Sequence, residues 1–541
     1  RPRTETSLVA GAGVGVGRYS CFRCGPPPPP TMRARPHPVA QLAAIVVAAA
    51  VGVVAAAPAW APASACPTTP PLVPLNATAD ARVGKALDAI AKMYSNATVA
   101  TPIPGIIVTI VQGEHIWFSR GFGTRNVSDP AAPEPGMDTM VRIASITKTF
   151  TSLMMMQLRD AGVVDLDDPV DKFMPDFAPR NPYNTTRPIT LRELSSHTSG
   201  LERENPCAAC NESEVLAAVS KRYLVTPQHG RAHYSNLGFG VLGQALSHAA
   251  GEPYTSYVES KMLRPMGMPQ ATFSYSRYVA QHLGVGVDNA GNVVPVANDT
   301  WSQGFDAPAG GLFASASGMA QYMKLMLRRN AVAGGQQLVD SATIEEVLKP
   351  AIVLRDGEAA FGHPWEFQYM GPDQTPGSHW VRSKAGELNG YRSQIALVPE
   401  LGLGIFASAL RSDVTPYDAS GTVWTIPALE LLVPAVDALL RAQQPPSSLP
   451  ADYKSYVGTY GPADDPLVVK VSGDGNQLVG TVEGLAVNFT VFEAAAAAGE
   501  HVLRVWHADP MSDSCRHLDD GSNLELAYFD VAASGAPATS V

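Results

Sequence analysis

The alternation of apolar and polar positions marks both ends of the main folded region as β-structure. Residues 105–123 (GIIVTIVQGEHIWFSRGFG) hold two β-branched and aromatic runs around a Gly-Glu turn, which predicts a β-hairpin. Residues 384–410 return to strand-like runs, RSQIALVP and GLGIFASAL, divided by the turn ELG. Between these regions, stretches of helical character at 142–162, 214–262 and 310–329 are punctuated by Gly or Pro. One sheet built from both ends, with a helical block inserted, is an α+β arrangement.

The pattern changes after a last predicted helix, ALELLVPAVDALLRA. The Pro-rich run QQPPSSLP predicts a linker, and six short strand-like runs follow it, from YVGTYG to LELAYFDV. Their regular turns predict a small antiparallel barrel or sandwich. The predicted organisation is an N-terminal extension (1–31), a signal segment (32–65), a linker (66–81), the α+β domain (82–440), a second linker (441–450) and a β-rich C-terminal domain (451–541).

The N-terminal region has the order of a secretory signal. From Met32, the charged head MRARPHP precedes the apolar run LAAIVVAAAVGVVAAA, and the small residues ASA stand before Cys66. An uncleaved membrane anchor is the alternative, because the apolar run falls between the lengths typical of the two. Both interpretations place the rest of the chain outside the cytosol, secreted or lumenal. The preceding Gly-rich and Pro-rich residues 1–31 are unsuited to a packed core.

Composition adds to this picture. The chain of 541 residues is 45% hydrophobic and 16% charged, with a net charge of -10. It lacks the clustered Lys and Arg that a nucleic-acid surface needs, so we expect no nucleic-acid partner. We expect several exposed loops to carry glycans, because seven asparagines occupy Asn-x-Ser/Thr sequons. These are Asn76, Asn96, Asn126, Asn184, Asn211, Asn298 and Asn488.

Ser145 and Lys148 form a Ser-x-x-Lys motif within RIASITKTFTSLMMMQLRDAG, residues 142–162. A serine hydroxyl is a weak nucleophile until a base removes its proton. Lys148 lies one helical turn beyond Ser145, so both side chains point the same way. A lysine serves as a base only if burial or a nearby cation lowers its pKa, and apolar neighbours here supply buried walls. The motif alone is a weak signal.

Two further motifs follow downstream. HYSNLGFGVLG places Tyr234 and Asn236 on a short loop before an apolar helix. SKAGELNGYRSQIALVP places Lys384 and Gly386 at the entry to a strand. The glycine lets a substrate approach the backbone, and the backbone N–H of Glu387 is then a candidate to face the cleft.

With these motifs in this order, region 82–440 resembles the serine β-lactamase and penicillin-binding-protein superfamily. It is most similar to the branch of class C β-lactamases, D-alanyl-D-alanine carboxypeptidases and esterases. LDLDDPVDKFMPDF, ITLRELSSHTSGL and PAGGLFASASGMAQYMKLML are also close to stretches typical of the family. The resemblance implies an antiparallel sheet flanked by helices, with an inserted helical block.

The resemblance also implies roles for these residues. Ser145 attacks a carbonyl to form an acyl-enzyme, while Lys148 and Tyr234 share the general-base and general-acid work. The backbone N–H groups of Ser145 and Glu387 form the oxyanion hole. Asn236 binds Lys148 or a substrate amide, and Lys384 lowers the pKa of Tyr234 and attracts a substrate carboxylate. The resemblance implies that the site needs no metal and no cofactor.

The sequence departs from the family pattern at Ala385, where a threonine is common. Loss of its hydroxyl, together with the negative charge of Glu387, favours an esterase or small-amide hydrolase. A β-lactamase or D-alanyl-D-alanine carboxypeptidase is the alternative, and a catalytically inactive binding or scaffolding member is the second. The expected substrate is a small ester, amide or β-lactam, and a membrane is a partner only if the signal segment is retained.

Other readings of the polar residues are weaker. The chain has no Gly-x-Ser-x-Gly elbow of an α/β-hydrolase. His229 and His233 stand four apart but lack a Glu partner, which favours a structural role over zinc. Cys207-Ala-Ala-Cys210 lacks the βαβ context of a thioredoxin-like redox site. Family relatives often carry a cysteine pair in this loop, which favours a Cys207–Cys210 disulfide. Four cysteines remain after the predicted signal cleavage, so Cys66–Cys515 follows only by elimination.

Overall fold

The computed structural model describes most of the chain between residues 80 and 529. No helix in this described part is both long and apolar enough to cross a membrane. The predicted N-terminal extension and signal segment lie outside it. The described residues are 80–100, 103–183, 187–207, 210–297, 304–328, 338–354, 357, 359–370, 379–412, 425–443, 449–450, 452–461, 463, 466–473, 475–482, 485–491, 501–507 and 526–529.

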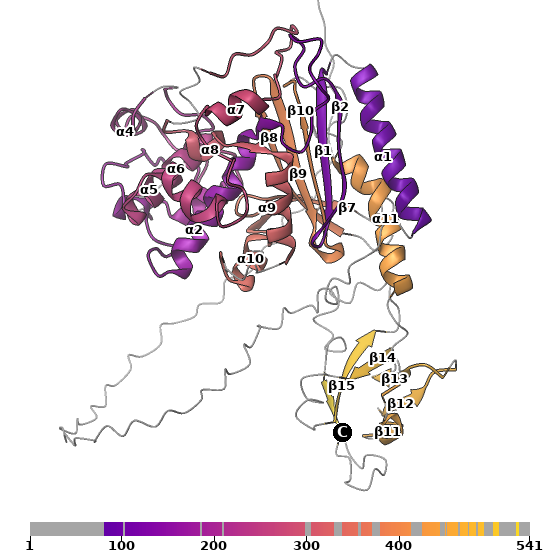
Figure 1. The fold of residues 1–541 in the computed structure, drawn as a ribbon. Coiled ribbons are helices and arrows are strands. Elements are labelled where there is room, and N and C mark those ends of the chain that lie inside the picture. The colour runs from indigo at the N-terminus through magenta and orange to yellow at the C-terminus, as the bar shows by residue number, and fades with distance from the viewer. Residues whose placement is uncertain are drawn as a thin grey trace, which may run out of the picture. The chain divides into compact units, whose positions relative to one another are not determined.

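An eight-stranded antiparallel sheet forms the centre of the main domain (Figure 1). Its strand order is β2-β1-β10-β9-β8-β7-β6-β5, so the N-terminal hairpin pairs with the last strand through β1 and β10. This confirms the predicted α+β fold with one sheet built from both ends. The strands are β1 (Gly105–Gln112), β2 (His115–Gly123), β5 (Ile352–Val353), β6 (Ala359–Phe361), β7 (Glu366–Met370), β8 (His379–Leu388), β9 (Tyr391–Val398) and β10 (Leu403–Ala409).

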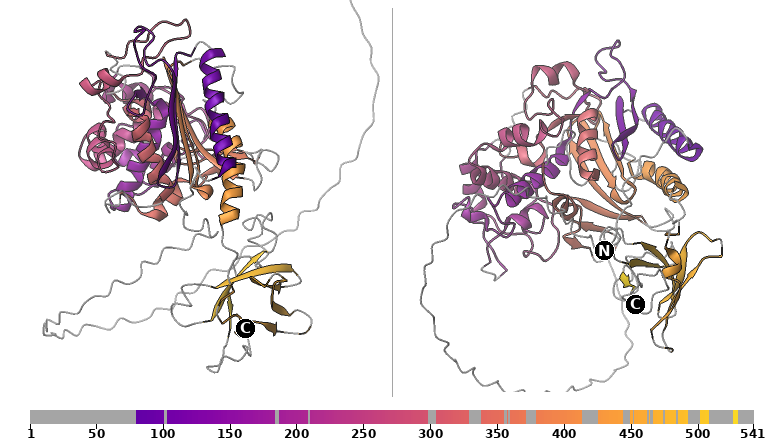
Figure 2. Two further views of the ribbon diagram at one scale, coloured as in Figure 1. Left: turned by 45° about the vertical axis from the view of Figure 1, so that its right-hand side comes forward. Right: turned by 60° about the horizontal axis from the view of Figure 1, so that its bottom comes forward.

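Helices cover both faces of the sheet (Figure 2). α1 (Ala81–Ala100) and α11 (Thr425–Gln443) pack together on one face. The inserted helical block covers the other, with a short ribbon of β3 (Met140–Arg142) and β4 (Phe313–Ser315). The block contains α2 (Thr147–Asp160), α3 (Leu191–Ser195), α4 (Glu212–Val219), α5 (Asn236–Ala250), α6 (Tyr254–Tyr257), α7 (Arg277–His282), α8 (Ala307–Gly310), α9 (Ala316–Arg328) and α10 (Ser341–Val347).

The sequence of β1 shows why this sheet is covered twice. Ile106, Val108 and Ile110 pack in the core beneath α1 and α11. Ile107 and Val111 point the other way, into the core of the helical block. Successive side chains of a strand face opposite sides, so a strand buried on both faces is mostly apolar, and in β1 only Thr109 and Gln112 are polar.

Close contact between α5 and α8 depends on a glycine. A Cβ atom added at Gly243 would lie 2.0 Å from Pro308 Cγ, far inside van der Waals contact. α8 can therefore lie directly against α5, with its carbonyl groups near α2. The Thr151 hydroxyl donates to the Pro308 carbonyl at 2.7 Å, which ties α2 to the same short helix.

Some boundaries differ from the sequence prediction. Lys384 and Gly386 lie inside β8 rather than at the entry to a strand, and residues 313–315 form β4 before α9 begins. The short strands β5, β6 and β7 have mixed, half-buried residues, so their pattern carries little strand signal. α1 begins at Ala81, one residue before the predicted domain start, and α11 extends past the predicted domain end to Gln443.

The C-terminal region forms a separate six-stranded antiparallel sheet. Its strands pair in chain order, each with the next, and bury a small core that includes Tyr456, Leu478 and Phe489. The described strands thus make one meander rather than the two facing sheets of a sandwich. They are β11 (Gly458–Tyr460), β12 (Leu467–Val471), β13 (Leu478–Val482), β14 (Leu485–Val491), β15 (Val502–His507) and β16 (Leu526–Tyr528).

Candidate active site

Ser145 lies in a tight turn between β3 and α2. The turn is a 3₁₀ segment, Ala144–Ile146, whose flanking Ala144 and Ile146 are buried while Ser145 is half-exposed. Ala144 has a φ of 49°, in the left-handed region that is unfavourable for a residue with a Cβ atom. Such backbone strain concentrates at functional sites, where the surrounding structure maintains it. The turn presents the Ser145 hydroxyl at the start of a buried helix.

Lys148 is fully buried behind Ser145. Its Nζ atom donates to Ser145 Oγ at 3.1 Å, to Asn236 Oδ1 at 2.7 Å and to the Ala309 carbonyl at 2.6 Å. All three acceptors are neutral. Burial disfavours the ammonium form, and its effect on the pKa of Lys148 exceeds the opposing effect of the Tyr234 charge, so the pKa falls below its ordinary value. Lys148 is therefore close enough to Ser145 to act as its base, and its lowered pKa favours the unprotonated form that a base requires.

Tyr234 lies between two lysines. The Nζ atoms of Lys148 and Lys384 are 5.0 Å and 4.9 Å from the centroid of its ring. Burial alone would raise the pKa of the Tyr234 hydroxyl, but the positive charges of the two lysines outweigh it, and the net direction is down. The hydroxyl is thus favoured to lose its proton more readily than that of an ordinary tyrosine.

His197 holds Tyr234 in place and was missed by the sequence analysis. Its ring centroid is 4.4 Å from that of Tyr234, its Nδ1 atom accepts from the Ser235 N–H, and its carbonyl accepts from the His233 N–H. Burial first, and then the charge of Lys148, hold the pKa of His197 well below its ordinary value. The neutral ring therefore packs on Tyr234 without adding a third positive charge. The preceding text, SSHTSGL, contributed to the family resemblance but did not indicate this contact.

Asn236 is oriented by Glu204, a second residue that the sequence did not indicate. Its Nδ2 atom lies 3.1 Å and 2.9 Å from the two carboxylate oxygens of Glu204. A carboxylate only accepts hydrogen bonds, so the amide NH₂ must face Glu204 and Oδ1 must face Lys148. The Asn236 N–H also donates to the Arg203 carbonyl at 2.7 Å. The segment after the SHTSGL loop thus positions the acceptor for Lys148.

β8 brings the remaining predicted residues to Ser145. A Cβ atom at Gly386 would lie 2.2 Å from the Ile143 carbonyl and 3.1 Å from the Ser145 nitrogen. The absence of a side chain therefore lets the β8 backbone, and Glu387 with it, pass directly beside the Ser145 turn. Lys384 is buried and its Nζ atom donates to Glu366 at 2.6 Å.

These residues line a cavity of about 770 Å³, within the size range of small-molecule sites. Its walls include Ser145, Tyr234, Asn236, Lys384, Gly386 and Glu387. The structure thus brings the three sequence motifs to one site, although they lie far apart in the chain.

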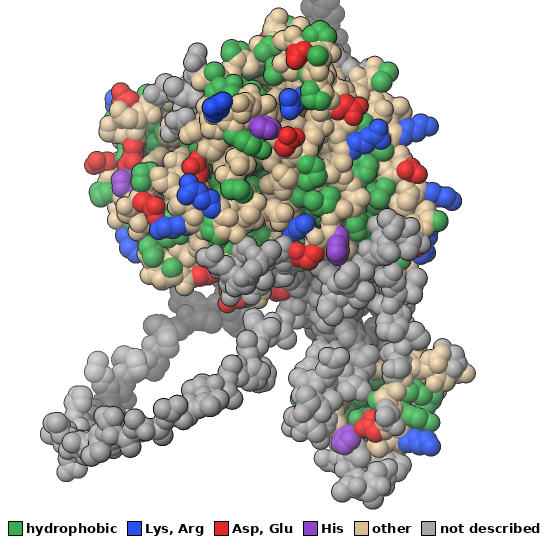
Figure 3. Space-filling model, viewed as in Figure 1, with side chains coloured by type: hydrophobic (Ala, Val, Ile, Leu, Met, Phe, Trp, Pro, Cys, Tyr) green, Lys and Arg blue, Asp and Glu red, His purple; other side chains and the backbone are tan. Residues whose placement is uncertain are grey.

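On the face shown in Figure 3, Lys and Arg side chains are interspersed with Asp and Glu and form no single basic patch.

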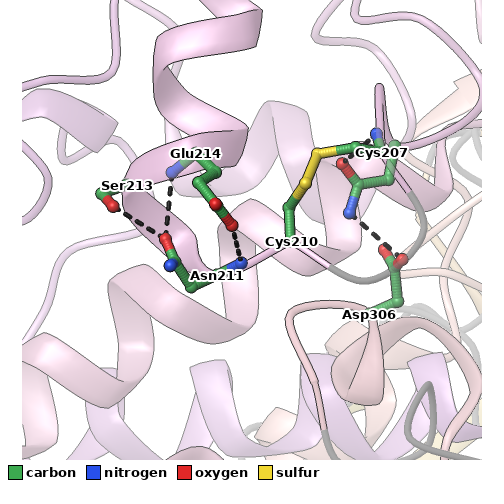
Figure 4. The surroundings of a disulfide bond; sticks show 7 residues. Cys207, Cys210, Asn211, Ser213, Glu214 and Asp306 are labelled. Atoms are coloured by element: carbon green, nitrogen blue, oxygen red, sulfur yellow. Dashed lines mark hydrogen bonds between the residues drawn. A yellow bond between two sulfur atoms is a disulfide. The ribbon is translucent and has the colours of Figure 1, made fainter.

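A disulfide closes the loop that follows Glu204 (Figure 4). Cys207 and Cys210 are bonded, with their Cα atoms 5.7 Å apart. Asn211, next in the chain, caps α4 by accepting from the Glu214 N–H and the Ser213 hydroxyl. The predicted partners Cys66 and Cys515 both lie outside the described residues.

The other predicted positions are distributed over the surface. His229 Nε2 lies 3.0 Å from Glu193, and the described residues contain no group of three or more side chains suited to hold a metal. Among the sequon asparagines, Asn96 and Asn211 are exposed, Asn126 and Asn488 are half-buried, and Asn76, Asn184 and Asn298 lie outside the described residues.

A family model described as Beta-lactamase matches residues 86–423, which is well over half of the chain. The chain belongs to the beta-lactamase family. The match contains all three motifs of the site. Beta-lactamase-like protein 2 of Dictyostelium discoideum is 34% identical over 500 residues and covers 87% of this chain and 87% of its own length. That similarity extends beyond the residues that the family model matches.

Two bacterial proteins are also similar to this chain, one in sequence and one in structure. D-alanyl-D-alanine-carboxypeptidase/endopeptidase AmpH of Escherichia coli is 31% identical over 326 residues, or 58% of this chain and 81% of AmpH. The crystal structure of a β-lactamase/D-alanine carboxypeptidase from Yersinia pestis matches with a TM-score of 0.52 and 26% identity. It covers 64% of this chain and 98% of its own, which confirms the β-lactamase/transpeptidase fold of the main domain.

Replacing Glu204 should change the proton affinity of Lys148. The negative charge of Glu204 favours the ammonium form, so Glu204→Gln should lower the pKa of Lys148 further, while Gln still accepts from Asn236. The acid limb of kcat/KM for an activated ester should therefore move to lower pH. The charged and titratable groups facing Lys148 are Tyr234, Lys384, Glu204 and the neutral His197, with Glu366 behind Lys384.

Glu202→Gln is the matched control, because Glu202 lies on the same loop but pairs with Arg222. Its acid limb should stay at the wild-type pH. An equal shift in both variants, or a shift to higher pH in Glu204→Gln, would contradict the effect of the Glu204 charge on the pKa of Lys148.

Proposed function

We propose that this protein is a serine hydrolase that cleaves small uncharged esters or amides through an acyl-enzyme on Ser145. The observation that carries the proposal is the 3.1 Å contact between Ser145 Oγ and Nζ of Lys148, a fully buried lysine that also donates to Asn236 Oδ1 and to the Ala309 carbonyl. The adjoining cavity gives a substrate carbonyl access to the half-exposed serine.

In the acylation step, Ser145 Oγ attacks the carbonyl carbon while its proton passes to the unprotonated Lys148–Tyr234 pair. The new Oγ–C bond leaves a negative charge on the carbonyl oxygen. The backbone N–H groups of Ser145 and Glu387 are the proposed donors to that oxygen. The tetrahedral species then collapses, the bond to the leaving alcohol or amine breaks, and the leaving group takes the proton from the pair.

Deacylation repeats the sequence with water as the nucleophile. The Lys148–Tyr234 pair removes a proton from the water, whose oxygen attacks the acyl carbon. Collapse of the second tetrahedral species breaks the Oγ–C bond, and Ser145 regains a proton from the pair. One ester or amide and one water thereby give one acid and one alcohol or amine, and the enzyme returns to its starting state.

The charges around the cavity support an uncharged substrate. Three cationic side chains line it, and each has a carboxylate partner: Lys384 with Glu366, Arg392 with Glu387, and Arg203 with Glu204. Ala385, next to Lys384, has no hydroxyl to bind a substrate carboxylate. These features favour an esterase or small-amide hydrolase over a β-lactamase or D-alanyl-D-alanine carboxypeptidase, whose usual substrates carry a carboxylate.

The proposal includes secretion or a lumenal location. It rests on the signal-like order of residues 32–65, on the seven sequons and on the Cys207–Cys210 disulfide, a bond that is rare in reducing compartments. A catalytically inactive family member is the alternative. The convergence of Ser145, Lys148, Tyr234 and Lys384 on one cavity argues against it.

Ser145→Ala should abolish covalent labelling by a fluorophosphonate probe, because the variant lacks the attacking oxygen. The thermal unfolding midpoint should stay close to that of the wild type. Ser412→Ala is the matched control, since Ser412 lines the same cavity, and it should label normally. Labelling that persists in Ser145→Ala, read by gel fluorescence and peptide mapping, would show that another residue is the nucleophile.

The wild-type protein should cleave a short neutral p-nitrophenyl ester much faster than a cephalosporin or a D-alanyl-D-alanine peptide. A missing hydrogen bond to a charged group costs about 1.5–3 kcal/mol, or roughly ten- to a hundredfold in kcat/KM. The three substrates are compared at equal enzyme concentration. Faster turnover of the cephalosporin would show that the lost hydroxyl and the three ion pairs do not control specificity, and it would favour the β-lactamase alternative.

A further inference from the structure

We infer that Glu366 is a specificity-determining residue: it supplies, from within the protein, the carboxylate that a substrate would otherwise place on Lys384. The site would then reject acyl groups that carry an anion at this position. This inference rests on the proposed function and names the residue that sets its substrate class.

The geometry fixes Glu366 against Lys384. The two residues lie on the paired strands β7 and β8, with Glu366 directly opposite Ser383 in the register. The Lys384 Nζ atom donates to Glu366 Oε1 at 2.6 Å and to the Ala385 carbonyl at 3.0 Å. Because both backbones belong to the central sheet, the carboxylate is held in place by a rigid element rather than by a loop.

Burial makes this pair hard to open. The side chain of Lys384 is 2% exposed and that of Glu366 is 29% exposed. A buried ammonium without a charged partner is strongly unfavourable, so Lys384 retains Glu366 unless another anion replaces it. A substrate carboxylate would have to displace Glu366 or lie beside it as a second negative charge. Either event weakens binding of an anionic acyl group relative to a neutral one.

The other two ion pairs of the cavity are less restrictive. The side chains of Arg203 and Glu204 are both 62% exposed; Glu387 is 57% exposed, and its partner Arg392 is 16% exposed. Water screens such pairs, and their side chains rearrange at little cost. An anionic substrate is therefore excluded mainly at Lys384, the one buried cation among the three that line the cavity.

Glu366→Gln tests the inference with two matched esters. One is a neutral p-nitrophenyl butyrate, and the other is a p-nitrophenyl ester of similar length that ends in a carboxylate. The glutamine retains an acceptor for Lys384 but removes the charge. The ratio of kcat/KM for the anionic ester to that for the neutral ester should rise by about tenfold or more over the wild type. Glu366→Gln/Lys384→Met should lose this gain, because the cation is gone.

Glu387→Gln is the control for charge alone. It removes one carboxylate from the same cavity but leaves the Lys384–Glu366 pair intact, so the ratio should change much less than in Glu366→Gln. An equal change in the two variants would overturn the assignment to Glu366. A wild type that cleaves the neutral ester, with no relative gain in Glu366→Gln, would overturn the inference but leave the proposed function standing. A wild type that cleaves neither ester would overturn both.

A measurement on the wild type does not depend on folding of the variant. Arylboronic acids form reversible adducts with a serine hydroxyl, so a carboxylated arylboronic acid is compared with its uncarboxylated analogue. The wild type should bind the two with similar inhibition constants, because Glu366 already occupies Lys384. Binding of the carboxylated compound about tenfold tighter would show that Lys384 is available to an external anion and would overturn the inference.

Discussion

The ammonium group of Lys148 is buried against neutral oxygens, and the rest of the site is built around that constraint. Its hydrogen bonds reach a serine hydroxyl, an asparagine amide and the carbonyl of Ala309. A carboxylate in the same place would stabilise the charge and hold the proton on Lys148. With neutral acceptors instead, burial favours loss of the proton, which is what a base for Ser145 requires.

The fold supplies each of these acceptors from a different element. The strained turn at Ala144 presents Ser145, and Glu204 orients the amide of Asn236 at the start of α5. α8 packs closely against Gly243 of α5, and the Ala309 carbonyl of α8 accepts a hydrogen bond from Lys148. The carboxylates of Glu204 and Glu366 bind neighbours of Lys148 and not Lys148 itself. Glu204 acts through Asn236, and Glu366 through Lys384. Neither carboxylate is hydrogen-bonded to Lys148 itself, whereas Tyr234 interacts with it directly.

The sequence predicted the parts of the site that depend on short-range spacing. Ser145 and Lys148 are three residues apart, and the β1–β2 hairpin has a turn of its own between two apolar runs. Lys384 and Gly386 were found because they match a family motif, but the prediction that they lie at the entry to a strand was wrong, because both lie inside β8. β7 was not predicted at all, since its half-buried residues give no clear period.

Glu204 and Glu366 were missed for a related reason. Each acts on a residue far along the chain: Glu204 is 32 residues from Asn236, and Glu366 is 18 residues from Lys384. No local pattern distinguishes these carboxylates from others on the surface, because their roles arise only when the loop after SHTSGL and the β7–β8 pair reach the cavity. The same holds for His197, whose contact with Tyr234 requires two segments of the helical block to meet.

The central claim is that Lys148 and Tyr234 act as one proton-transfer unit for Ser145, and a double-mutant cycle on kcat tests it most directly. Lys148→Ala and Tyr234→Phe should each lower kcat for a neutral ester by roughly a thousandfold. If the two residues form one unit, the double variant should be about as slow as the slower single variant. A double variant whose loss equals the product of the two single losses would show independent roles and contradict the account.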